Sequence, residues 1–230
     1  NPIVNMFRVK EIRSRIFFTL IVLAVFRLGS VLTIPGINPE ALTTYFRSAT
    51  GASNSFVDYM DFFAGGAFSN FSVFMLGVMP YISTQIILQL ALIIFPSLKR
   101  IAQEDGGQKK IQSWTRIGTV FVCLIQSLAV TVYASSIPGA VVISSDFLFK
   151  VIAMISVTTG TMVTIWLGEQ ITARGIGNGI SMLIFAGIVA RLPSAVWELG
   201  RMVSEDMSKL VSVIVVLIMF VGIVILVIYE

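Results

Sequence analysis

The sequence predicts an all-α polytopic membrane protein, built from about six transmembrane helices and one short re-entrant segment. Hydrophobic residues make up 56% of the 230 residues and charged residues only 12%, whereas a soluble domain carries about 25% charged residues. Apolar runs long enough for a hydrocarbon core of about 30 Å recur along the chain. We therefore expect residues 1–230 to form one helical bundle in a membrane. The predicted spans are 16–34, 71–95, 117–134, 151–167, 179–192 and 210–229.

The first span follows a basic arm, residues 1–15, and lacks a small-residue cleavage site, so we expect it to be retained. Arg27 lies inside this span, and a cation at membrane depth indicates a functional residue by default. Because Arg27 lies toward the outer end of the helix, it could also snorkel to the surface or pair with a loop acid.

The second span is preceded by an unusual element. Residues 62–95 form an almost uncharged run of 34 residues, which as one helix would reach roughly 51 Å at about 1.5 Å per residue. Gly65, Gly66 and Pro80 interrupt the run. We therefore expect residues 61–70 to dip into the membrane and a true span to begin at Phe71. Such backbone is tolerated at membrane depth only where protein buries it or water surrounds it, which predicts a cavity or pore.

The second span carries a stripe at helical spacing, and Gln89 indicates which way the stripe faces. An amide is costly against acyl chains, so we expect this side to face the protein interior. Ile82 and Ile86 are then either core residues between helices or the lining of a constriction. The stripe consists of Met75, Met79, Ile82, Ile86, Gln89 and Ile93.

The fifth span begins after a glycine-rich turn. Glycine-rich turns can bind phosphate, but here no strand precedes the glycines, so a tight cytoplasmic reversal is the better interpretation. We expect Glu169 and Arg174 to pair across the turn, and Asn178 to accept hydrogen bonds from the first amides of the next helix. The turn glycines are Gly175, Gly177 and Gly179.

Ile180 and Ile184 repeat on the fifth span the spacing of Ile82 and Ile86 on the second. A collar of β-branched side chains, stiff at χ1, makes a narrow apolar constriction. Such a collar blocks ions by dewetting and can still yield around a passing chain.

Lysine and arginine are distributed unevenly between the loops, which predicts the orientation. The basic arm holds four of these residues, and the loop after the second span holds five. Cytoplasmic loops carry the excess, so we expect a cytoplasmic N-terminus. The same basic surface would attract anionic lipid or dock a ribosome or motor protein. The chain stops directly after the sixth apolar run, so we expect it to be part of a longer protein.

The composition argues against catalysis. The chain has no histidine, the commonest general base and metal ligand, and its single cysteine, Cys123, lies in an apolar span. No carboxylate lies deep in a predicted span. We therefore expect no enzyme activity, no cofactor, no metal site and no intrachain disulfide.

Two separated stretches of the chain resemble the SecY family of protein-conducting channels, in particular its bacterial branch. The first comprises Phe62 to Ser69 together with Met79-Pro80-Tyr81-Ile82-Ser83. The second comprises Leu167 to Thr172 together with Arg174 to Ser181. The resemblance extends over nearly the whole chain, and it implies the first half and the sixth span of a channel with ten spans in two inverted halves.

The resemblance also implies roles for individual residues. Ile82, Ile86, Ile180 and Ile184 match pore-ring positions, and the second span matches part of the lateral gate. Residues 61–70 match the plug that closes the outer funnel. The plug residues are Phe62, Phe63, Ala64, Gly65, Gly66, Ala67, Phe68 and Ser69.

The implied partners are SecE and SecG subunits, a SecA motor or a translating ribosome, and signal sequences and unfolded polypeptide. The implied location is the bacterial plasma membrane. In this family the second half completes the ring and the gate, so we expect this chain alone neither to seal nor to transport.

Two other classes of protein remain as alternatives. A secondary transporter with broken helices would need ionisable residues deep in the bundle, and the predicted spans hold only Arg27, with Arg191 at a span end. An intramembrane enzyme would need a base within reach of a hydroxyl such as Ser83 or Ser181, and the sequence indicates none.

Overall fold

The computed structural model describes residues 9–48, 61, 64–104, 106–143, 145–205 and 209–229. Regular structure within these residues is helical, apart from isolated antiparallel β-bridges at Thr33–Ser72 and Ile37–Val141. The chain divides into two compact units, residues 1–188 and residues 189–230. The all-α fold class predicted from the composition is confirmed.

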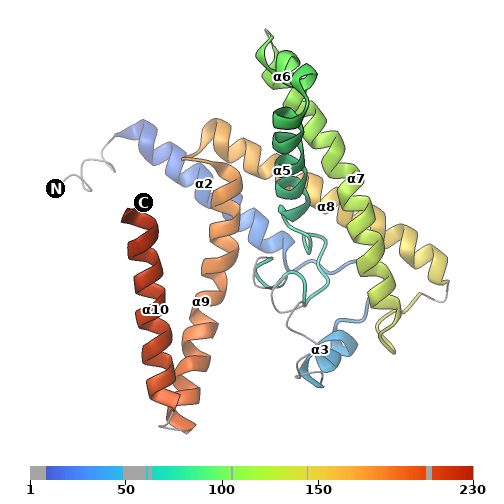
Figure 1. Ribbon diagram of the computed structural model, residues 1–230. Coiled ribbons are helices and arrows are strands. Elements are labelled where there is room, and N and C mark those ends of the chain that lie inside the picture. The colour runs from blue at the N-terminus through green and yellow to red at the C-terminus, as the bar shows by residue number, and fades with distance from the viewer. Residues whose placement is uncertain are drawn as a thin grey trace. The chain divides into compact units, whose positions relative to one another are not determined.

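The first unit is organised around α7 (Gly107–Ser135), which packs along both α5 (Met79–Ile94) and α8 (Asp146–Arg174) (Figure 1). The helix α2 (Lys10–Gly29) packs against α8 as well. The remaining elements of this unit are α3 (Pro39–Ser48), α6 (Pro96–Gln103) and the first turns of α9 (Gly179–Glu205).

Small polar residues on α7 recur at every fourth position and are all buried. Each threonine or serine hydroxyl donates to a carbonyl of its own helix, as Thr119 does to Thr115 O at 2.6 Å, so the hydroxyls can enter the core without remaining unpaired. Small side chains also let helix backbones approach closely in membranes. The buried series is Thr115, Thr119, Cys123, Ser127 and Thr131.

A helix occupies each of the six predicted spans. By length and composition, Gly107–Ser135, Asp146–Arg174 and Gly179–Arg201 can each cross a membrane, and α5 and α6 qualify as a pair although they bend by 106°. The first helix lies earlier in the sequence than predicted, since α2 runs from Lys10 to Gly29 and does not reach Ile34. Beyond Gly29 the backbone pairs with a distant segment, because Ile34 N–H donates to Phe71 O at 2.9 Å.

The predicted start of the second span is wrong. The helix α5 begins at Met79, and residues 64–78 before it form consecutive turns. Phe71 and Gly77 have φ angles of 44° and 50°, which a right-handed helix does not accept. Val73 N–H donates instead to Leu32 O at 2.9 Å. Pro80 can occupy the first turn of α5 because its missing N–H would lack a helical partner there.

Although it is not helical, the turn segment 64–78 is part of the main core. Ala67, Phe71 and Met75 are almost completely buried, and they belong to one cluster with Leu42 and Phe149. The backbone of α8 approaches this segment at Gly160, where a Cβ atom would lie 2.0 Å from Val73 O. The turn segment is therefore tightly enclosed by helices.

The second unit contains the rest of α9 and α10 (Lys209–Tyr229). The fifth helix is longer than predicted, because it continues through Pro193 to Glu205 and does not end at Leu192. The described side chains of α10 from Leu210 onward are exposed, apart from the half-buried Val213, and nearly all are apolar. A helix that is apolar on all sides is typical of a membrane span.

The contact between α8 and the turn segment can be tested with Gly160→Ala. The added Cβ would overlap a backbone carbonyl that cannot rotate away, so we expect a destabilisation of about 1–3 kcal/mol and a lower thermal unfolding midpoint of the solubilised complex. Gly222→Ala in α10 is the matched control, because a Cβ there meets nothing within 4 Å. Equal midpoints for the two variants would contradict the close approach.

Candidate functional site

The residues predicted to form the plug are arranged around the carboxylate of Asp61, whose side chain is 4% exposed. Asp61 Oδ1 accepts a hydrogen bond from Ser69 N–H at 2.8 Å, and its backbone carbonyl accepts from Gly66 N–H at 3.0 Å. Gly65 and Gly66 adopt φ angles of 64° and 91°, which favour glycine. These contacts fold residues 64–70 into a compact loop.

Four of the predicted plug residues are buried: Ala64, Gly65, Ala67 and Phe68. Ala64, Ala67 and Phe68 belong to the main core cluster. Phe68 also lies against Phe71, with ring centroids 5.9 Å apart. Phe62 and Phe63, the first two predicted plug residues, lie outside the described residues.

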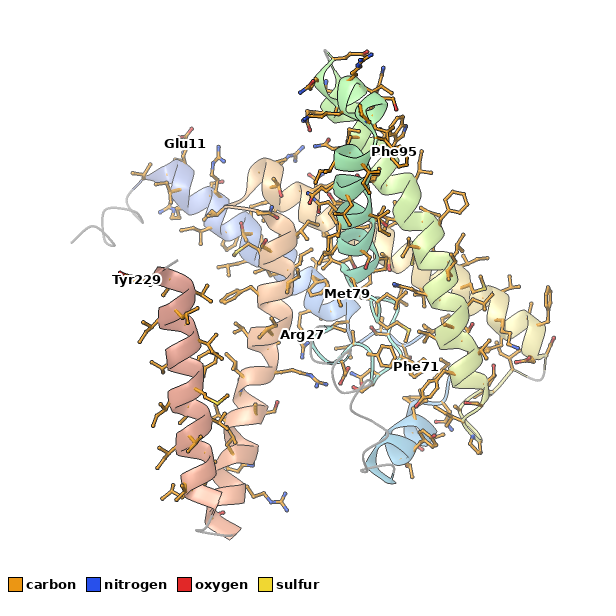
Figure 2. All side chains as sticks on the ribbon, viewed as in Figure 1. Glu11, Arg27, Phe71, Met79, Phe95 and Tyr229 are labelled. Atoms are coloured by element: carbon orange, nitrogen blue, oxygen red, sulfur yellow. The ribbon has the colours of Figure 1, made fainter. Side chains whose placement is uncertain are left out.

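Arg27 binds the plug loop directly. Its guanidinium donates a 2.6 Å hydrogen bond to Gly65 O, and Figure 2 shows Arg27 at the end of α2 farther from Glu11, next to the turns that lead to Met79. Snorkelling to the surface and pairing with a loop acid were the two alternatives for Arg27, and the observed partner is a backbone carbonyl of the loop. A charged donor makes this a stronger bond than one between neutral groups.

The structure brings three of the four predicted ring isoleucines into one apolar cluster. Ile82, Ile180 and Ile184 pack against a buried group that includes Phe26 of α2 and Leu183 of α9. Ile86 lies one turn farther along α5, where its side chain is 52% exposed.

An apolar cavity of about 350 Å³ lies between predicted ring isoleucines and the predicted plug loop. Ile82 and Ile184 line it from the ring positions, and Ala64 and Phe68 line it from the plug loop. The remaining lining comes from the turns before α5, the start of α5 and the middle of α7. Among the described residues of this lining, only Ser83 and Gln126 have polar side chains.

The helix α5 packs on α7 through a side that the sequence analysis did not single out. Pro80 and Thr84 are buried, and a Cβ at Gly118 of α7 would lie 2.7 Å from Thr84 Cγ2. At about 100° per residue, this side is nearly opposite the stripe that contains Ile82 and Ile86. Ile82 and Ile86 therefore lie on the side of α5 opposite this contact, although the cavity lined by Ile82 also borders the middle of α7.

The turn before α9 has the predicted helix cap. Asn178 Oδ1 accepts hydrogen bonds from Ile180 N–H at 3.0 Å and from Ser181 N–H at 3.3 Å. The glycines allow α8 and α9 to meet, because a Cβ at Gly179 would lie 1.8 Å from Gly168 O. Asn178 and Gly179 thus position the first turn of α9, which carries Ile180.

Glu169 has a different partner from the one predicted. It forms a bidentate ion pair with Arg116 of α7, with N–O distances of 2.9 and 2.8 Å, so the predicted pairing with Arg174 is corrected. This pair could not be predicted from local sequence pattern, because the two residues are 53 positions apart. Both lie just beyond the predicted ends of their spans, and the observed helices are long enough to bring them face to face.

The predicted ring positions and the cavity offer aliphatic and aromatic surface. Among the described residues no group of three histidine, cysteine or acidic side chains could hold a metal ion.

Comparison with known proteins identifies relatives of this architecture. The family model described as SecY matches residues 72–230. The Protein translocase subunit SecY of Borreliella burgdorferi is 46% identical over 214 residues, which cover 93% of this chain and 49% of the relative. The subunit of the same name from Escherichia coli K12 is 41% identical, over 91% of this chain and 48% of the relative.

Solved structures show the same fold at lower sequence identity. A structure titled "The structure of a protein conducting channel" superposes with a TM-score of 0.59 at 18% identity, over 91% of this chain and 47% of that one. "Sec61 in the Canine ribosome-channel complex from the endoplasmic reticulum" matches with the same values. The chain spans about half the length of the curated relatives it matches.

The ion pair between α7 and α8 can be tested with a double-mutant cycle of Arg116→Gln and Glu169→Gln. The two side chains are 50% and 34% exposed, so solvent screens the pair, and we expect a coupling free energy of at most about 1 kcal/mol. Thermal unfolding of the solubilised complex measures the coupling. Strictly additive effects of the two substitutions would contradict a direct pair.

Proposed function

The chain belongs to the SecY family, and from this we propose that it contributes pore helices, part of the lateral gate and the plug to a Sec protein-conducting channel. The complete channel would pass unfolded secretory proteins across the membrane and release membrane proteins sideways into the lipid. The observation that carries the proposal is the apolar cluster of Ile82, Ile180 and Ile184, which borders a cavity also lined by Ala64 and Phe68 of the plug loop.

The chemistry of the ring fits a polypeptide conduit. A translocating chain presents every kind of side chain, so a ring with fixed charges or hydrogen-bond donors would retain some segments and repel others. Isoleucine side chains offer neither charge nor hydrogen bonds, and their stiff χ1 angles keep the resting passage narrow. A resting ring of this kind blocks ions by dewetting.

The second half of the channel would supply the helices that complete the ring and the lateral gate. Ile86 is 52% exposed and Ile87 is 60% exposed, so α5 has apolar surface available for further helices on one side and lipid on the other. We assign Ile86 to the ring, facing helices beyond this chain. Asn178 and the turn glycines would hold the cytoplasmic ends of α8 and α9 in register, and Glu169 would join α8 to Arg116 of α7.

The proposed partners follow from the family. They are SecE- and SecG-like subunits, and on the cytoplasmic side a SecA motor or a translating ribosome. One solved structure with this fold is titled as part of a ribosome–channel complex. The basic residues of α6 and the start of α7, Lys99, Arg100, Lys109 and Lys110, would lie on that cytoplasmic side together with the N-terminal arm.

The proposed location is the bacterial plasma membrane, with a cytoplasmic N-terminus. The excess of Lys and Arg in the arm and in the loop around α6 supports this orientation. The relatives that carry the name of a protein translocase subunit favour a polypeptide conduit over a secondary transporter or an intramembrane enzyme.

Cysteine crosslinking in the complete translocase tests the proposal, using a stalled secretory chain that carries one cysteine. Cys123→Ser provides the background, and Ile86→Cys, Ile180→Cys and Ile184→Cys provide probes on α5 and α9. We expect crosslinks at these three positions, because their side chains would surround the translocating chain.

Two neighbours serve as controls matched for depth. Ile87→Cys lies next to Ile86, and Phe185→Cys, with a side chain 59% exposed, lies next to Ile184. Each is turned by about 100° from its neighbour and should not crosslink. Crosslinks confined to the control positions, or absent altogether, would reject the assignment of the ring.

A further inference from the structure

Gly65 of the plug loop is held from two sides. From α2, the Arg27 guanidinium donates a 2.6 Å hydrogen bond to Gly65 O. From α9, the backbone of Gly187 approaches so closely that a Cβ at Gly65 would lie 2.8 Å from Gly187 Cα and 3.0 Å from Gly187 O. No side chain separates the two backbones at this point.

The contact on α9 continues the face that carries the ring isoleucines. Ile180, Ile184 and Gly187 are spaced by four and three residues, so they lie on one side of the helix. Ile184 lines the cavity beside the plug residue Phe68. One face of α9 therefore presents the ring side chains and, one turn later, bare backbone against which the plug loop rests.

We propose that Gly65 is the docking point of the plug and that Arg27 is a positioning residue that holds the plug in its resting place against Gly187. The inference rests on the proposed function as a channel with a plug. It names two residues that hold the plug in place, Gly65 and Arg27, and it makes the docked state depend on the positions of α2 and α9.

The two contacts make the closed state sensitive to the spacing of α2 and α9. Val22 and Phe26 of α2 belong to the same buried cluster as Leu183 of α9, and Leu167 and Ile171 of α8 belong to it as well, so α8 joins the two helices at rest. A translocating chain or signal sequence that separates α2 from α9 would remove the Arg27 hydrogen bond and the Gly187 contact in the same movement. Plug release would then follow from helix separation without a further trigger.

Arginine suits this role because it can bind a carbonyl without being buried. Arg27 lies in the last turn of α2, and its residue surface is exposed. Its charged donor strengthens the bond, while solvent limits the strength so that the plug can still leave. Lysine at this position would keep the charge but lose the fixed planar geometry of the guanidinium.

The test uses the complete translocase in the Cys123→Ser background. Phe68→Cys in the plug and Ile184→Cys on α9 line the same cavity, and the yield of their crosslink by a short bismaleimide reports the docked plug. Ion conductance of idle channels in planar bilayers is measured separately, without the added cysteines.

Arg27→Gln should lower the crosslink yield and raise idle conductance about tenfold, the effect of losing one hydrogen bond to a charged group. Arg27→Lys should give a crosslink yield and an idle conductance between those of the parent and those of Arg27→Gln.

Arg13→Gln is the control for the loss of charge, since Arg13 lies near the opposite end of α2. Gly65→Ala is an independent variant, because its Cβ would both strain a φ of 64° and meet the backbone of Gly187. Gly139→Ala is the control for strain alone, with a φ of 76° and no atom closer than 4.0 Å. We expect Gly65→Ala to reproduce the effect of Arg27→Gln and both controls to match the parent.

The possible outcomes separate this inference from the proposed function. Parent-like crosslinking and conductance in Arg27→Gln and Gly65→Ala, in channels that still transport, would overturn the docking role. If Arg27→Gln fails to assemble, Arg27→Lys and Gly65→Ala decide the question by the same readouts. Failure of the parent translocase itself to transport a secretory chain would instead reject the proposed function.

Discussion

Backbone amides and carbonyls that lie within an apolar bundle must find partners, and residues 64–78 meet this requirement without forming a helix. Val73 N–H bonds to Leu32 O, and Ile34 N–H bonds to Phe71 O, so the turn segment pairs with the chain that leaves α2. Asp61 and Arg27 satisfy further groups of the plug loop. An unpaired peptide group at this depth would cost several kcal/mol. The cross-connections therefore determine where α2 ends, where α5 begins and how the plug loop folds.

The positions of the ring isoleucines follow from this arrangement. Because the chain stays non-helical through Gly77, α5 begins at Met79, and Ile82 falls in its first turns beside the cavity. On the other side, the Asn178 cap and the contact of Gly179 with Gly168 O place Ile180 and Ile184 at the start of α9. Two helices that begin near the same apolar cluster thus direct isoleucines into it. Ala64 and Phe68 of the predicted plug loop line this cavity and belong to the main core cluster.

The sequence predicted the parts of this account that depend on local pattern. Apolar run length located the helices, glycine and proline marked the non-helical segment, and the cap at Asn178 was evident from its position before a helix. The parts that depend on distant partners were not predictable in the same way. The helix start at Met79 depends on hydrogen bonds that join residues 71–73 to Leu32 and Ile34. Glu169 pairs with Arg116, and not with Arg174, which is nearer in sequence, because two long helices bring Glu169 and Arg116 face to face. The Arg27 contact is with a carbonyl, which leaves no signature in side-chain composition.

The most direct test of the central claim is residue-resolved amide hydrogen exchange of residues 64–78 in the complete translocase embedded in lipid. If cross-connections satisfy this backbone, the amides of Ser69, Ser72 and Val73, which are all hydrogen-bonded here, will be protected although they belong to no helix. Protection of Ile34 should accompany that of Val73, since the same pair of segments bonds both. Exchange of these amides at the rate of an unstructured loop would contradict the account, because the segment would then be solvated and could not orient α5 or hold the plug.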